Sequence, residues 1–99
     1  MKGAIASVEI FVAEAGTTEG QRRRLTLTVT APDRADDGGG WMCRVALADL
    51  HRPTAVTGLD SVSALGAAIA QARAWLDALD AQGATLFRDR KGESRFQLE

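Results

Sequence analysis

The sequence predicts an α+β domain, in which an antiparallel β-meander of four to five strands carries one long helix packed on one face. Three observations predict this fold. The first half of the chain alternates apolar and polar residues, segments rich in Gly, Pro and Asp separate the alternating runs, and the second half holds one long segment of helical periodicity. At 99 residues and 45% hydrophobic content, residues 1–99 have the size of a single domain.

Three strands are predicted in the first half of the chain. Residues 4–13 place small and aliphatic side chains at every second position, and residues 23–30 alternate leucine and valine with threonine. Residues 41–50 show the same period of two. The predicted core faces of these strands carry Ala4, Ala6, Val8, Ile10 and Val12, then Leu25, Leu27 and Val29, then Trp41, Cys43, Val45 and Leu47.

The connections between these strands predict a meander. Residues 14–20 and 31–40 concentrate Gly, Pro and Asp, which favour turns, so both segments are expected to be hairpin loops. His51 falls in a further predicted turn, and the β-branched stretch 54–57 predicts a short fourth strand.

The second half predicts one helix of about six turns. Asp60 or Ser61 can cap its first turn, and Gly83 can adopt the left-handed conformation that ends a helix. Beyond the helix, residues 84–88 and 94–98 predict one or two strands around a turn. The helix face predicted to pack on the sheet carries Val62, Leu65, Ile69, Ala72, Leu76 and Leu79, with Ala68 and Trp75 at its margins.

A short motif at the start of this helix carries a resemblance. The run from Gly58 to Val62 (Gly-Leu-Asp-Ser-Val) precedes a long Ala-rich helix, and Trp41-x-Cys43 lies on a strand upstream. These features resemble a family of small uncharacterised bacterial proteins, and the resemblance covers residues 8–83. It implies strands followed by one helix. Because that family has no established activity, the resemblance implies no catalytic residue in this chain.

Composition and charge exclude several classes of function. Twelve basic and 13 acidic side chains give a net charge of −1, which provides no long-range attraction to phosphate backbones or anionic lipids. No stretch approaches the roughly 18 apolar residues that span a bilayer, and the first residues lack the apolar core of a signal peptide. We therefore expect a cytoplasmic protein with no membrane contact, for which nucleic acid is a disfavoured partner.

No group of residues predicts a catalytic, metal or cofactor site. Cys43 and His51 are the only thiol and imidazole, but Cys43 falls on a core face, where a thiolate is disfavoured. Asp33, Asp36 and Asp37 precede three glycines without the spacing of a calcium-binding loop and favour a solvated hairpin. Because acid, base and nucleophile do not converge, we expect no enzymatic activity, no cofactor and no metal.

Two surfaces are candidates for contact with a partner. On the open sheet face, Phe11 is expected opposite Arg24, with Glu9 nearby. On the outer helix face, alanines gather, while Asp77 and Asp80 oppose the helix macrodipole, for which partner contact is one explanation. Since one helix covers only one sheet face, a homodimer that buries the other face is expected. The candidate interaction surface comprises Phe11, Arg24, Arg44, Ala67, Ala70, Ala74 and Ala78.

These observations favour a non-enzymatic protein-interaction or accessory domain, whose partner is a second copy of the chain or another protein. The first alternative is a small-molecule binding module, with a pocket between helix and sheet beside Trp41 and Trp75. The second alternative is a weak nucleic-acid binder that uses Arg22, Arg24 and Arg44.

Overall fold

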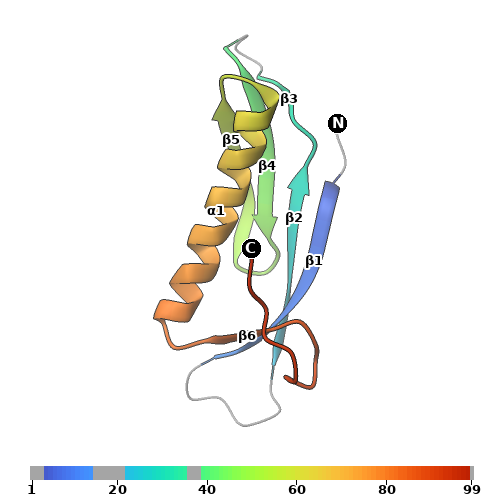
Figure 1. Ribbon diagram of the computed structural model, residues 1–99, viewed down its shortest axis with the longest axis vertical. Helices are drawn as coiled ribbons and strands as arrows, with labels where there is room; N and C mark the ends of the chain where they lie inside the picture. Colours follow the sequence, from blue (N-terminus) through green and yellow to red (C-terminus); the bar gives the residue numbers. More distant parts are fainter. Residues whose placement is uncertain (1–3, 15–21, 36–38, 99) are drawn as a thin grey trace.

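A computed structural model describes residues 4–14, 22–35 and 39–98 (Figure 1). It confirms the predicted α+β architecture: an antiparallel six-stranded sheet carries one 21-residue helix, which packs on β4 and β5. In chain order, the elements are β1 (Ala4–Ala13), β2 (Arg23–Thr30), β3 (Asp33–Arg34), β4 (Trp41–Leu47), β5 (His51–Gly58), α1 (Ser61–Ala81) and β6 (Thr85–Phe87).

The strands form one sheet in which every pairing is antiparallel. β4 pairs with β5 along its length, and also with β2 and β3, while β1 lies between β2 and β6. The register confirms the expected juxtaposition of Phe11 with Arg24. Glu9 also lies nearby, because its carboxylate is 3.8 Å from the Arg24 guanidinium.

Three strands differ from the sequence prediction. β4 was predicted over residues 41–50 but ends at Leu47, and residues 48–50 form a turn before β5. β3 lies within the segment predicted to be a hairpin loop, since Asp33 and Arg34 pair with β4. Pro32 cannot donate a backbone hydrogen bond, so it separates β3 from β2. His51 begins β5 rather than lying in a turn, and β5 is longer than predicted. A proline at position 53 is tolerated because β5 pairs only with β4 and its register shifts there.

The helix begins and ends as predicted, but its buried face differs. The Asp60 carboxylate accepts a hydrogen bond of 2.6 Å from the Ser63 N–H, and Gly83 follows the helix with a φ of +91°. Val62 was predicted to be in the core but is 78% exposed. The helix is rotated so that a row of alanines, whose short side chains allow close approach to the sheet, takes the central position. The buried helix residues are Ala64, Ala68, Ala72, Leu76 and Leu79.

The motif at the start of α1 has a packing role. A Cβ added to Gly58 would lie 2.4 Å from the Ala64 nitrogen and 2.6 Å from the Ser63 carbonyl carbon. Gly40, with a φ of +107°, faces the same point, and a Cβ there would lie 2.6 Å from the Gly58 oxygen. The end of β5, the start of α1 and the residue before β4 therefore meet at two glycines without side chains.

The chain after β6 completes the core. The Phe96 N–H donates to the Leu86 carbonyl at 3.0 Å, and Arg95 forms a bridge with Phe87, so the predicted C-terminal hairpin is present. Phe96 is buried in the main hydrophobic cluster, and Leu98 packs against that cluster. Figure 1 shows this tail turning back from β6 toward the middle of the molecule. The core therefore has a third component besides sheet and helix.

The cap of α1 predicts a pH dependence of stability. The backbone hydrogen bond from Ser63 is the main cause that lowers the pKa of Asp60. The charged cap therefore stabilises the folded chain above the ordinary carboxyl pKa of about 3.9, and this contribution is lost as the pH falls through the lower folded-state value. Asn caps a helix about as well as Asp but does not titrate. We expect the melting temperature of wild type to fall relative to that of Asp60→Asn as the pH drops below about 4; a difference that stays constant with pH would contradict this.

Candidate functional site

Two arginines and two phenylalanines form a row across adjacent strands on the outer face of the sheet. Phe11 of β1 lies opposite Arg24 of β2 on one side and opposite Phe87 of β6 on the other. Arg95 of the C-terminal hairpin lies opposite Phe87. Because side chains alternate along a strand, Phe11, Arg24 and Phe87 face away from the side that carries Ile10, Leu25 and Leu86. Arg95 lies outside the named strands, and its side chain reaches a hollow that Leu86 also lines.

Two further arginines lie on this row and complete what we call the arginine cluster: Arg22, Arg24, Arg90 and Arg95. The guanidinium carbon of Arg22 is 5.1 Å from the centre of the Phe87 ring, and that of Arg95 is 5.7 Å from it. The guanidinium carbon of Arg90 is 5.8 Å from the centre of the Phe11 ring. These distances are typical of cation–π contacts, which hold a planar guanidinium in a defined place.

The cluster corrects the expectation that Phe11 is an exposed aromatic side chain. The face of β1 on which Phe11 lies was predicted correctly, but the Phe11 side chain is only 8% exposed. Phe87 of β6 and Arg90 of the C-terminal turn lie against it. The chain's own distant segments therefore occupy the surface that was predicted to contact a partner through Phe11.

The C-terminal turn is tied to the start of β2 through Arg22. The Asp89 carboxylate accepts hydrogen bonds from the Glu93 and Ser94 N–H groups, and the bond from Ser94 is the main cause that lowers the Asp89 pKa. Arg22 donates to the Arg90 carbonyl at 3.2 Å. A Cβ at Gly92 would lie 2.4 Å from the Arg22 guanidinium, so this glycine provides the space in which Arg22 lies.

Positive charge concentrates at this end of the molecule, which measures 49 Å along its longest axis. Segments 9–14, 22–24 and 88–95 hold seven basic and four acidic side chains, whereas the rest of the chain holds five and nine of the totals of 12 and 13. Glu9 pairs with Arg24 at the surface, where ion pairs are weak. Among the described residues, no carboxylate lies within ion-pair distance of Arg90 or Arg95.

The remaining residues of the predicted interaction surface lie elsewhere. The Arg44 N–H donates to Thr30, which is six residues from Arg24 along β2, a separation of about 20 Å. Arg44 therefore does not form one patch with Arg22 and Arg24. The predicted helix alanines lie on α1, on the opposite face of the sheet from the cluster: Ala70, Ala74 and Ala78 are exposed and Ala67 is half-buried.

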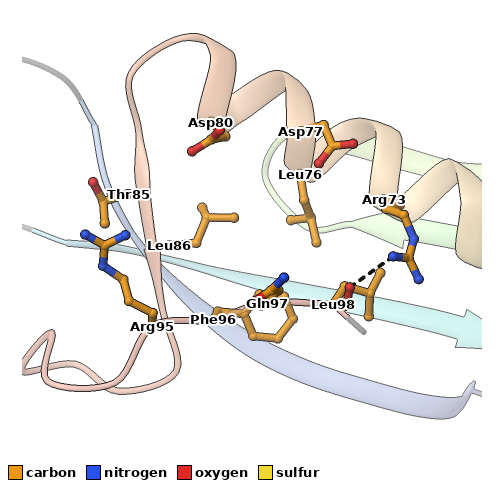
Figure 2. Close-up of a pocket in the computed structure, with 10 residues that line it drawn as sticks. All are labelled: Arg73, Leu76, Asp77, Asp80, Thr85, Leu86, Arg95, Phe96, Gln97 and Leu98. Carbon is orange, nitrogen blue, oxygen red and sulfur yellow. Dashed lines mark hydrogen bonds between the residues drawn. The ribbon is translucent and has the colours of Figure 1, made fainter.

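A hollow of about 630 Å³ lies between α1, β6 and the C-terminal tail (Figure 2). Apolar side chains of Leu76, Leu86 and Phe96 line it, and Asp77 and Asp80 line it from the helix. Arg73 also lines the hollow but donates to the Leu98 carbonyl at 3.2 Å rather than pairing with Asp77. The predicted pocket lay beside Trp41 and Trp75, and neither tryptophan lines this hollow.

The cysteine and the histidine do not meet. Cys43 lies opposite Val56, whereas His51 lies opposite Leu47, which is about 13 Å further along β4. The His51 ring instead stacks on Trp75, with 4.4 Å between ring centres and 4° between planes. Among the described residues, no group of three His, Cys, Asp or Glu side chains could hold a metal ion, and Asp36 and Asp37 lie outside the described residues.

Burial of Cys43 predicts low reactivity. The side chain is 1% exposed, and burial raises the pKa of its thiol. Since the thiolate is the reactive form, we expect reaction with a disulfide reagent to be at least about 100-fold slower in the native chain than in denaturant. Release of the reagent's chromophore measures both rates. Equal rates would show that the β4 core face opens readily.

Sheet, single helix and C-terminal hairpin define the class: a small α+β domain with a basic surface at one end. The chain belongs to the family described as Domain of unknown function (DUF6968), whose model matches residues 14–98. The matched region overlaps residues 8–83, the region of the expected resemblance, from residue 14 onward, and continues through the C-terminal hairpin. Comparison with curated proteins and with solved structures gave no match. Within the described residues, no helix is long and apolar enough to cross a membrane.

Proposed function

We propose that this chain is a non-enzymatic protein-interaction domain of a small bacterial protein that acts in the cytoplasm, and that it binds its partner through the arginine cluster. The observation that carries this proposal is the fixed row of arginine and phenylalanine side chains on the outer sheet face. The guanidiniums of Arg22, Arg90 and Arg95 lie over aromatic rings, and the rest of the molecule carries more acidic than basic side chains. The separation of Cys43 from His51 supports a role without catalysis.

The chemistry of arginine supports binding at this surface. Arginine is enriched at the energetic centres of protein interfaces, because its planar fork donates several hydrogen bonds and its faces pack on aromatic rings. Stacking on Phe11 and Phe87 restricts the side chains before a partner arrives, which reduces the entropy lost on binding.

Capture from the native host tests this proposal with matched variants. Arg90→Ala/Arg95→Ala removes two charges from the cluster, and Arg44→Ala/Arg52→Ala removes two exposed charges elsewhere. We expect the wild-type chain and the second variant to retain the same partner protein, identified by mass spectrometry, and the first variant to lose it. Equal retention by both variants, or no protein above background, would contradict the proposal.

Self-association is a further proposal on the same molecule, because the apolar side chains of Leu59, just before α1, and Val62, in its first turn, are 93% and 78% exposed. A second copy that covers this pair would account for its exposure in the single chain. We expect a mass that rises with concentration in analytical ultracentrifugation, and Leu59→Ser/Val62→Ser to abolish the rise. A monomer at every concentration would remove this proposal.

A small-molecule binding module is the second candidate function, favoured by the hollow in Figure 2. Asp77 and Asp80 beside the apolar side chains of Leu76, Leu86 and Phe96 suit a compact amine with a hydrophobic body, and Arg73 and Arg95, which also line the hollow, favour an amine that carries a carboxylate. We expect such amines to raise the melting temperature of wild type but not of Asp77→Asn/Asp80→Asn. No shift with any amine would remove this candidate.

A further inference from the structure

We infer that the arginine cluster binds a short acidic segment of a partner protein, whose Asp or Glu carboxylates contact Arg90 and Arg95. This inference rests on the proposed function and names the chemistry of the partner at the same surface.

The first step concerns which charges of the cluster are available. Arg24 already pairs with Glu9. Arg22 is half-buried, donates a hydrogen bond to the Arg90 carbonyl, and has an Nε without a hydrogen-bond partner. Arg90 and Arg95 are exposed and have no ion-pair partner among the described residues. Their guanidiniums present planar donor forks, which match the two oxygens of a carboxylate.

The second step concerns the size of the ligand. The row crosses the three neighbouring strands β2, β1 and β6 and the segment that bridges to β6 at Arg95, which spans about 14 Å. Beyond segments 9–14, 22–24 and 88–95, the chain carries five basic and nine acidic residues. An anionic ligand is therefore attracted at this end and repelled further along the molecule, so charge complementarity favours a short segment over a long polyanion.

The third step separates an acidic peptide from a nucleic acid. Single-stranded nucleic acids use exposed aromatic rings on which bases stack. Phe11 is buried, and Phe87 is half-buried and already contacts two guanidiniums. The cluster thus offers charge without an open stacking surface, which suits carboxylates better than bases.

The experiment measures binding of labelled peptides to the full chain by fluorescence anisotropy. The probes are a short peptide in which glutamate alternates with serine, the same peptide with glutamine in place of glutamate, a single-stranded oligonucleotide of similar length, and inorganic phosphate as competitor. We expect the glutamate peptide to bind, the glutamine peptide not to bind, and affinity to fall as salt is added.

Matched variants locate the binding. We expect Arg90→Ala/Arg95→Ala to weaken binding of the glutamate peptide about tenfold, since two exposed charge contacts are lost, and Arg44→Ala/Arg52→Ala to leave it unchanged. Arg90→Lys/Arg95→Lys keeps the charge without the planar fork and should fall between them. Thermal melts of each variant show whether the fold persists, and the lysine variant keeps the test valid if the alanine variant unfolds.

The inference would be overturned by no binding of the glutamate peptide, by equal weakening in both alanine variants, or by tighter binding of the oligonucleotide, which would assign the surface to nucleic acid. Displacement by phosphate as effective as by the glutamate peptide would assign the site to phosphate groups and also overturn it. If capture from the host depends on the cluster while the glutamate peptide fails to bind, the proposed function stands and only the acidic chemistry is wrong.

Discussion

Gly58→Ala is expected to lower the free energy of unfolding by about 3 kcal/mol, near the upper end of the usual cost of overpacking. The added methyl would lie 2.4 Å from the Ala64 nitrogen and 2.8 Å from the Ser63 Cβ. Backbone cannot move aside as a flexible side chain can, so α1 must shift away from β5. Unfolding in urea, followed by circular dichroism, measures the loss.

The chain provides a matched control in Gly66, which lies exposed in the middle of α1. A Cβ added there meets nothing within 4 Å. Alanine favours a helix over glycine by roughly 1 kcal/mol, so Gly66→Ala should raise the free energy of unfolding by up to that amount. A Gly58→Ala variant as stable as wild type would show that the end of β5 and the start of α1 are not in close contact.

Phe96→Ala is expected to cost about 3 kcal/mol, the usual size for a phenylalanine removed from a core. Phe96 is 9% exposed and belongs to the main hydrophobic cluster, and its N–H donates to the Leu86 carbonyl. Its loss would enlarge the hollow beside Leu76 and loosen the tail. Urea unfolding measures the cost.

The neighbouring Gln97 is exposed, and Gln97→Ala should change stability by less than about 0.5 kcal/mol. An equally small effect of Phe96→Ala would show that the tail does not contribute to the core.

Local patterns were sufficient for most elements of the fold. The alternation of leucine and valine with threonine predicted β2 with its core face, and Asp60 and Gly83 marked both ends of α1. The buried face of α1 was predicted less well. The apolar residues at steps of three and four placed Val62 on the predicted buried face, whereas the sheet contacts a row of alanines. Small residues carry little hydrophobic signal, and the close approach that they allow depends on the partner strands.

The candidate site required contacts between distant segments. The opposition of Phe11 and Arg24 was predicted on the assumption that residues 14–20 close tightly, and the register of β1 and β2 confirms the opposition. The opposition of Phe11 to Phe87 joins segments more than 70 residues apart, and no local pattern specifies it. The signal that could have suggested the cluster was the pair Phe87-Arg88 before the turn at residues 89–93 and the pair Arg95-Phe96 after it.

The position of β1 in the sheet has a consequence for folding during synthesis. β1 pairs with β2 and also with β6, so β1, which is synthesised early, pairs with a strand that is synthesised late. Until residues 85–96 have left the ribosome, one edge of β1 is unpaired and the core face beside it lacks Phe96. Contacts this distant in sequence slow folding, because closing a long loop costs entropy before the contact forms. The nascent chain therefore exposes a pairing edge through most of its synthesis, a period in which aggregation competes with folding.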